Sequence, residues 1–83
     1  MTTQWSLVST IEREEKICDL AQQELKNRCR IYENKYNLSS DEFYKRFQEG
    51  KMGDEEDFFE WKALIEGIKE WAHTKENLKG LIK

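Results

Sequence analysis

Proline is absent from this chain of 83 residues, and only four residues are glycine. These two residue types interrupt helices most strongly, because proline lacks the backbone N–H and glycine loses much conformational freedom on ordering. Glu, Lys, Leu and Gln, which all favour helices, are abundant in the sequence. The composition therefore predicts long helices and an all-α fold.

The length of the chain predicts one helical domain that spans residues 1–83. Hydrophobic residues make up 37% of it and charged residues another 37%. A chain this small buries a smaller fraction of its surface than a larger one does, so its own core is marginal. We therefore expect a protein partner to complete the hydrophobic surface.

The first helix is predicted to start at the segment Ser9-Thr10-Ile11-Glu12. In such a capping box the Ser9 hydroxyl accepts a hydrogen bond from the Glu12 amide, and the Glu12 carboxylate returns one. This pattern predicts a helix over about 10–37, preceded by a flexible start over 1–8. Asn37 suits the helix end because asparagine tolerates the left-handed conformation.

Apolar residues recur along this helix at spacings of three, four and seven, which is typical of one buried face. The face comprises Ile11, Cys18, Ala21, Leu25, Cys29, Tyr32 and Tyr36. Three more apolar residues flank it, namely Ile17, Leu20 and Ile31. The widened face predicts a second contact surface in addition to the one that packs inside the hairpin.

A second capping box, formed by Ser39 and Glu42, predicts a short helix over about 40–49. The helix is expected to stop at Gly50. Gly50 and Gly53 are predicted to shape the turn that follows, with Gly53 at positive φ or in close packing, because glycine adopts positive φ without steric cost. Asp54 is the predicted N-cap of the next helix.

The third helix is predicted over about 55–79, with Gly80 at its end. Its apolar residues, spaced by threes and fours, include Phe58, Trp61, Leu64, Ile65, Ile68, Trp71 and Leu78. Gly67 inside this helix is expected to allow close approach of a neighbouring backbone. The predicted fold is thus two long antiparallel helices joined by a short helix, and two such hairpins are expected to dimerise into a four-helix bundle.

Charge and cysteine spacing exclude several classes of protein. The net charge is −3, so nucleic-acid binding by this chain alone is not expected, and the longest apolar run falls far short of the roughly 20 residues that span a bilayer. Cys18 and Cys29 are 11 residues apart in one helix, about 16 Å along its axis, which rules out a disulfide between them. Reduced, buried thiols in a cytoplasmic protein are the expectation.

Two patterns raise an alternative in which the helices hold divalent metal ions. Glu70-x-x-His73 has the spacing of ligand pairs in di-metal helical bundles, with Glu24 and Glu33 as completing carboxylates. The pairs Glu12/Glu15 and Asp57/Glu60 have the one-turn spacing that all-α nucleotide pyrophosphohydrolases use to hold magnesium. Acidic residues in the first turns of predicted helices also complement the helix dipole, and this explanation is favoured. We therefore expect no cofactor and no enzymatic activity.

The central segment carries the pattern F-x3-F-x2-G-x2-G-D-x2-D-x2-E-W, from Phe43 to Trp61. This pattern resembles small helical antitoxin-like proteins of prokaryotic toxin–antitoxin pairs. The resemblance covers about the middle quarter of the chain. It implies a non-enzymatic interaction module that binds and neutralises a small toxin-like partner. The basic ribbon or helix-turn-helix with which antitoxins bind DNA is not evident.

Within this segment Asp54, Asp57, Glu60 and Trp61 are the predicted partner-binding residues. Their spacing on the third helix would set an acidic rim beside an aromatic anchor, which suits a basic protein partner. The alternative is that Trp61 belongs to the core and that the carboxylates only complement the helix start.

Overall fold

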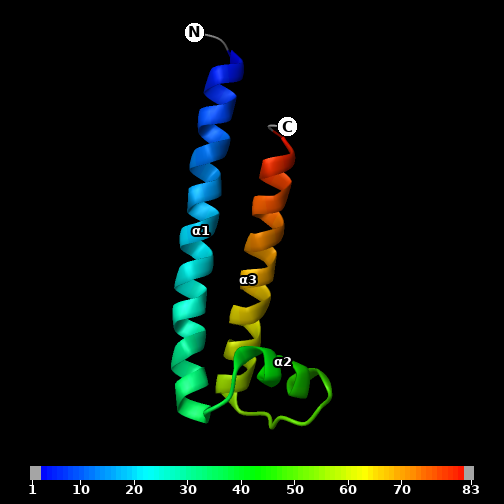
Figure 1. Cartoon of the computed structure of the whole chain (residues 1–83). Helices are drawn as coiled ribbons and strands as arrows, with labels where there is room; N and C mark the ends of the chain where they lie inside the picture. Colours follow the sequence, from blue (N-terminus) through cyan, green and yellow to red (C-terminus); the bar gives the residue numbers. More distant parts are fainter. Residues whose placement is uncertain (1–2, 82–83) are drawn as a thin grey trace.

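The computed structural model describes residues 3–81 and consists of three helices in that range, with no strand. Helix α1 spans Thr3–Tyr36, α2 spans Ser40–Gln48 and α3 spans Glu56–Gly80. Figure 1 shows α1 and α3 side by side in opposite directions, with both chain ends at the same end of the molecule. The predicted all-α hairpin with a short connecting helix is confirmed.

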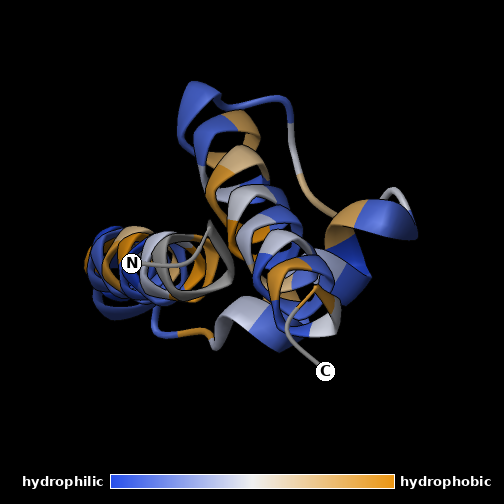
Figure 2. Cartoon of the chain, turned by 90° about the horizontal axis from the view of Figure 1, so that it is seen from above, coloured by the Kyte–Doolittle hydropathy of each residue, from blue (hydrophilic) through white to orange (hydrophobic). Residues whose placement is uncertain are grey.

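The molecule is long and thin, measuring 56 × 21 × 17 Å. Helix α3 packs along α1, while α2 packs against α3 near the closed end of the hairpin. Viewed along the long helices in Figure 2, α2 crosses on the α3 side of the hairpin. Among the described residues, no helix is both long enough and apolar enough to cross a membrane.

The start of α1 differs from the sequence prediction. Ser9 lies inside the helix, which begins at Thr3, so the predicted start near Thr10 is wrong. Nothing between Thr3 and Val8 breaks a helix, so the capping-box residues simply continue it. Met1 and Thr2 of the predicted flexible start lie outside the described residues.

The C-terminal end of α1 and the start of α2 agree with the sequence prediction. Asn37 has a φ of 51°, the left-handed conformation predicted for the end of α1. Ser39 is the N-cap of α2, and its hydroxyl accepts a hydrogen bond from the Glu42 amide at 3.1 Å. These features are fixed by a few neighbouring residues, so the sequence alone was sufficient to predict them.

The turn between α2 and α3 is only partly as predicted. Gly50 has a φ of 73°, which a residue with a Cβ adopts only with strain. Gly53 does not have a positive φ, and a Cβ added there would meet nothing within 4 Å. The prediction that Gly53 needs positive φ or close packing is therefore wrong. The N-cap of α3 is Glu55, one residue after the predicted Asp54, and it makes no side-chain capping hydrogen bond.

The hydrophobic core lies at the closed end of the hairpin, where all three helices meet. Its buried residues are Cys29, Phe43, Phe58, Trp61, Leu64 and Ile65. The rings of Phe43 and Trp61 stack with centroids 4.0 Å apart and planes 3° apart. Tyr32 and Tyr36 stack on Trp61 with centroids at 5.8 and 6.0 Å. An aromatic cluster therefore holds α2 against both long helices.

Toward the chain ends the two long helices are held by fewer buried groups. Ile11 and Cys18 are buried on α1. The Gln22 amide donates to the Ile68 carbonyl at 3.4 Å, and Lys75 of α3 pairs with Asp19 of α1. Gly67 permits a close approach, but the neighbour is a side chain: a Cβ there would lie 3.0 Å from Leu25 Cδ1. The expected backbone contact at Gly67 is thus replaced by a side-chain contact.

Candidate functional site

The predicted aromatic anchor, Trp61, has no exposed surface. Besides its ring contacts, its indole N–H donates to the Ser40 hydroxyl at 2.9 Å. A buried Trp with its polar atom satisfied contributes to the fold, because burying an indole without a partner for its N–H would be unfavourable. Trp61 in this conformation is a core residue and cannot act as the exposed anchor of a partner surface, which corrects that part of the prediction.

Asp57 joins the start of α3 to the end of α1. Its carboxylate accepts hydrogen bonds of 2.6 Å from both the Lys35 ammonium and the Tyr36 hydroxyl. The bond from Lys35 and then that from Tyr36 lower the pKa of Asp57. The same bond from Lys35 to Asp57 raises the pKa of Lys35. Asp57 is thus a structural link between the long helices, a role in addition to any at a rim.

Glu60 makes a second link one turn further along α3. It accepts a 2.6 Å hydrogen bond from the Tyr32 hydroxyl. This bond, with a smaller contribution from burial, raises the pKa of Tyr32 to about 12. The phenol is therefore neutral, and a hydrogen-bond donor, at every physiological pH. Of the predicted rim, Asp54 remains exposed in the turn before α3 and makes no hydrogen bond or ion pair within the described residues.

Sequence reasoning missed Tyr32, Lys35 and Tyr36 as the partners of the predicted carboxylates. Tyr32 and Tyr36 were assigned to the buried stripe, which is true of their rings, but their hydroxyls reach out to α3. The usable signal was the position of Lys35 in the last turn of the first long helix and of Asp57 in the first turn of the second long helix. In an antiparallel hairpin these two ends lie side by side.

The carboxylates and the histidine considered as metal ligands do not gather. No group of three or more His, Cys, Asp or Glu side chains within the described residues could hold a metal ion. Glu24 pairs with Arg28, and Glu33 accepts a hydrogen bond from the Ser40 amide. The donor sets proposed for a di-metal bundle or a pyrophosphohydrolase are thus not assembled in this conformation of the single chain.

The two cysteines are free and buried, as predicted. Burial raises the pKa of the Cys29 thiol; the hydrogen bond with Ser40 opposes this shift and the nearby Glu33 charge adds to it. A raised thiol pKa disfavours the thiolate, which is the nucleophilic form. Cys29 therefore fills space as a small apolar group.

In contrast to these satisfied groups, the outer side of α1 exposes large aliphatic side chains. Ile17, Leu20 and Ile31 are 42%, 71% and 65% exposed. Figure 2 shows hydrophobic residues on the side of α1 that faces away from α3 as well as on the side that faces it. We call these three residues the outer apolar face of α1. They are the residues that sequence periodicity predicted would widen the apolar stripe.

Comparison with known proteins adds no relative: no protein-family model, no curated protein and no solved structure matches this chain. The functional argument therefore rests on the residues themselves.

Proposed function

We propose that this protein is a non-enzymatic, antitoxin-like interaction module that binds and neutralises a small partner protein in the prokaryotic cytoplasm. The observation that carries this proposal is the outer apolar face of α1, whose Ile17, Leu20 and Ile31 are exposed. Aliphatic side chains of this size gain free energy when a partner removes them from water, at about 25 cal/mol per Å² of apolar surface.

The shape of this face suits a helical partner. Ile17, Leu20 and Ile31 lie on one side of α1, and the first and last of them are 14 positions apart, about 21 Å along the axis. Between them Glu24 and Arg28 form an ion pair of 3.2 Å, so that the middle of the face carries no net charge. Ile17 and Leu20 have the i, i+3 spacing of anchors in helix-in-groove recognition, and Ile31 adds a third apolar residue on the same side three turns further along.

Self-association uses the same face. Two hairpins that pair through the outer sides of their α1 helices form a dimer in which the exposed aliphatic residues become buried. Because each α3 packs on the opposite side of its own α1, the four helices of this dimer form a row, and not the closed four-helix bundle expected from the sequence. This arrangement is the proposed resting state of the protein, and a partner then competes for the same surface.

Charge supports a basic partner. The net charge is −3, and Asp54, Glu55 and Glu56 are exposed at the closed end of the hairpin. Exposed charges of one sign speed the encounter with an oppositely charged partner, and salt screens this effect. Asp54 replaces Asp57 as the residue expected to steer association, because Asp57 is engaged by Lys35 and Tyr36.

The self-association test compares the wild type with the variant Leu20→Ser/Ile31→Ser by sedimentation at micromolar concentration. We expect a dimer for the wild type and the 10.0 kDa monomer for the variant, with equal helicity by circular dichroism. Phe59→Ser, which changes an exposed ring on α3, is the matched control and should remain dimeric. A monomeric wild type would contradict the proposed self-association.

The partner test uses the small protein encoded beside this gene. Co-expression of the wild-type chain should relieve growth arrest caused by that protein, and the purified pair should bind. The Leu20→Ser/Ile31→Ser variant should fail in both assays. A neighbouring product that is neither toxic nor bound by the wild type would contradict the antitoxin-like proposal.

A further inference from the structure

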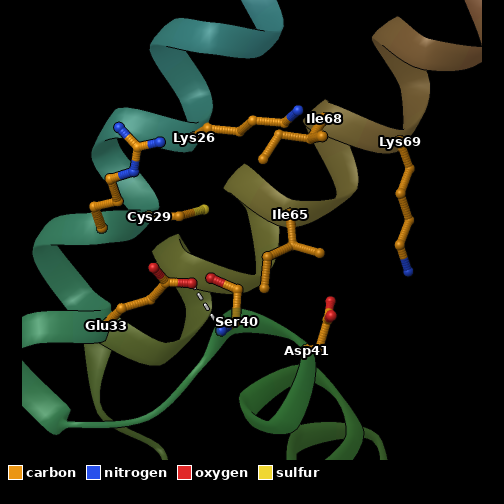
Figure 3. A pocket seen from close by; sticks show the side chains of 9 residues that line it. Lys26, Cys29, Glu33, Ser40, Asp41, Ile65, Ile68 and Lys69 are labelled. Atoms are coloured by element: carbon orange, nitrogen blue, oxygen red, sulfur yellow. Dashed lines mark hydrogen bonds between the residues drawn. The ribbon is translucent and has the colours of Figure 1, made fainter.

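A cavity of about 430 Å³ lies between α1, the start of α2 and α3, on the closed half of the hairpin (Figure 3). Its volume falls within the range typical of small-molecule sites. The lining residues are Lys26, Cys29, Arg30, Glu33, Ser40, Asp41, Ile65, Ile68 and Lys69. The apolar residues form one wall of the cavity, and the charged residues border that wall.

The inner wall of the cavity is apolar. Ile65 and Ile68 of α3 form it together with Cys29 of α1, whose thiol is buried. Figure 3 shows the Cys29 side chain directed from α1 toward α3, which contributes Ile65 and Ile68. A hydrocarbon group placed there would contact aliphatic and sulfur atoms and would leave water.

Cationic groups border the same wall from both long helices. Lys26 and Arg30 are one turn apart on α1, and Lys69 is contributed by α3. Within the described residues none of the three pairs with a carboxylate. Arg30 donates only to the neutral Asn27 side chain at 3.0 Å, and the Lys69 ammonium lies 3.9 Å from the centroid of the Tyr44 ring.

The anionic residues of the cavity, by contrast, are already compensated. Glu33 accepts a 2.9 Å hydrogen bond from the Ser40 amide at the start of α2. Asp41 lies in the first turn of α2, where the positive end of the helix dipole favours a negative charge. Beside its apolar wall the cavity therefore has two cations, Lys26 and Arg30, without a carboxylate partner among the described residues. The third, Lys69, lies over the Tyr44 ring, and Glu33 is engaged by the start of α2.

We propose that this cavity binds a small amphipathic anion, a carboxylate or phosphate carried on a short hydrocarbon group. Lys26 and Arg30 contact the anionic group, and Ile65 and Ile68 contact the hydrocarbon. This site lies apart from the outer apolar face of α1 and does not depend on the proposed protein-binding function.

The first test is calorimetric titration of the full chain with octanoate. Two control probes each lack one half of the proposed chemistry: 1-octanol has the hydrocarbon without the charge, and acetate has the charge without the hydrocarbon. We expect saturable binding of octanoate and at least about tenfold weaker binding of either control, because 1-octanol loses the charge-assisted contacts and acetate loses the burial of the hydrocarbon. Octyl phosphate in a parallel titration shows which anionic group is preferred.

The second test locates the site. In the variant Lys26→Gln/Arg30→Gln octanoate should bind about tenfold more weakly, whereas Lys45→Gln, an exposed cation of α2 outside the cavity, should leave affinity unchanged. Both variants change exposed residues, and circular dichroism verifies that each is folded. Bound octanoate should also slow the reaction of Cys29 with a thiol reagent more than that of Cys18, which lies outside the cavity.

Three results would overturn the proposal. They are the lack of saturable octanoate binding at millimolar concentration, equal affinity for octanoate and 1-octanol, and unchanged affinity in the Lys26→Gln/Arg30→Gln variant.

Discussion

The rings of Phe43 and Trp61 lie almost parallel, with their centroids 4.0 Å apart, and neither side chain has exposed surface. This pair connects the short helix α2 to the long helix α3 at the centre of the aromatic cluster. The stability of the closed end of the hairpin should therefore depend on these two rings more than on any exposed aromatic side chain.

Truncating Phe43 tests this dependence. Phe43→Ala removes a fully buried ring and should lower the free energy of unfolding by about 3 to 5 kcal/mol. Phe59→Ala on α3, whose side chain is 52% exposed, should cost less than about 1 kcal/mol. Urea denaturation monitored by circular dichroism measures both values, and equal losses would show that the aromatic stack has no special role.

The Asp57 link predicts a specific pH dependence. Because the folded-state pKa of Asp57 is lowered from its ordinary 3.8, ionised Asp57 stabilises the fold above that pH. This contribution is lost as the pH falls through the lower, folded-state pKa. Asp57→Asn should therefore be less stable than the wild type at pH 7, and the difference should shrink progressively below about pH 4. A constant difference from pH 7 to pH 2 would contradict the assignment.

Replacing Ser39 and replacing Ser9 should affect stability differently, because only Ser39 caps a helix. Ser39→Ala removes the hydroxyl that accepts from the Glu42 amide and should destabilise the protein by about 1 kcal/mol. Ser9 lies inside α1 and is exposed, so Ser9→Ala should be neutral or stabilise by a few tenths of a kcal/mol, since alanine favours helix interiors. Thermal melting of the two variants checks the contrast, and a loss at Ser9 would restore it as a cap.

Two glycines of one turn should also respond differently. Gly50→Ala forces a residue with a Cβ into a φ of 73° and should cost about 1 to 2 kcal/mol. Gly53→Ala meets open space and ordinary backbone geometry, so a change within about 0.5 kcal/mol is expected. The melting temperatures of the two variants measure this difference in stability. A larger loss at Gly53 would reinstate the prediction made from the sequence.

The features that sequence predicted well depend on residues close together in the chain. Ser39 and Asn37 act through hydrogen bonds and dihedral angles within one turn, and the periodic stripe correctly placed Cys18 and Cys29 on the buried side of α1. The periodic apolar residues of α3 likewise included Trp61. Whether Trp61 would be covered depended on where α2 packs, and no local pattern specifies that.

The errors have two origins, contacts between distant parts of the chain and, at Ser9, the residues just before the signature. The carboxylate of Asp57 is engaged by Lys35 and Tyr36, residues more than twenty positions earlier, so its role depends on the register of the hairpin. The cavity residues Lys26 and Ile68 come from different helices, and the register of the hairpin is what makes them line one cavity. At Ser9 a genuine capping signature failed because the residues before it could continue the helix.

The aromatic cluster lies at one end of the hairpin, so we expect the two ends to differ in how often the helix–helix contacts open. Separating α1 from α3 at the chain ends disrupts Ile11, Cys18 and the Asp19–Lys75 pair, and it leaves the stack around Trp61 intact. Backbone amides near the chain ends should then exchange with deuterium through partial unzipping, while those of α3 beside Trp61 exchange only through global unfolding. The hairpin therefore opens from the chain ends inward, while the closed end keeps the two long helices together.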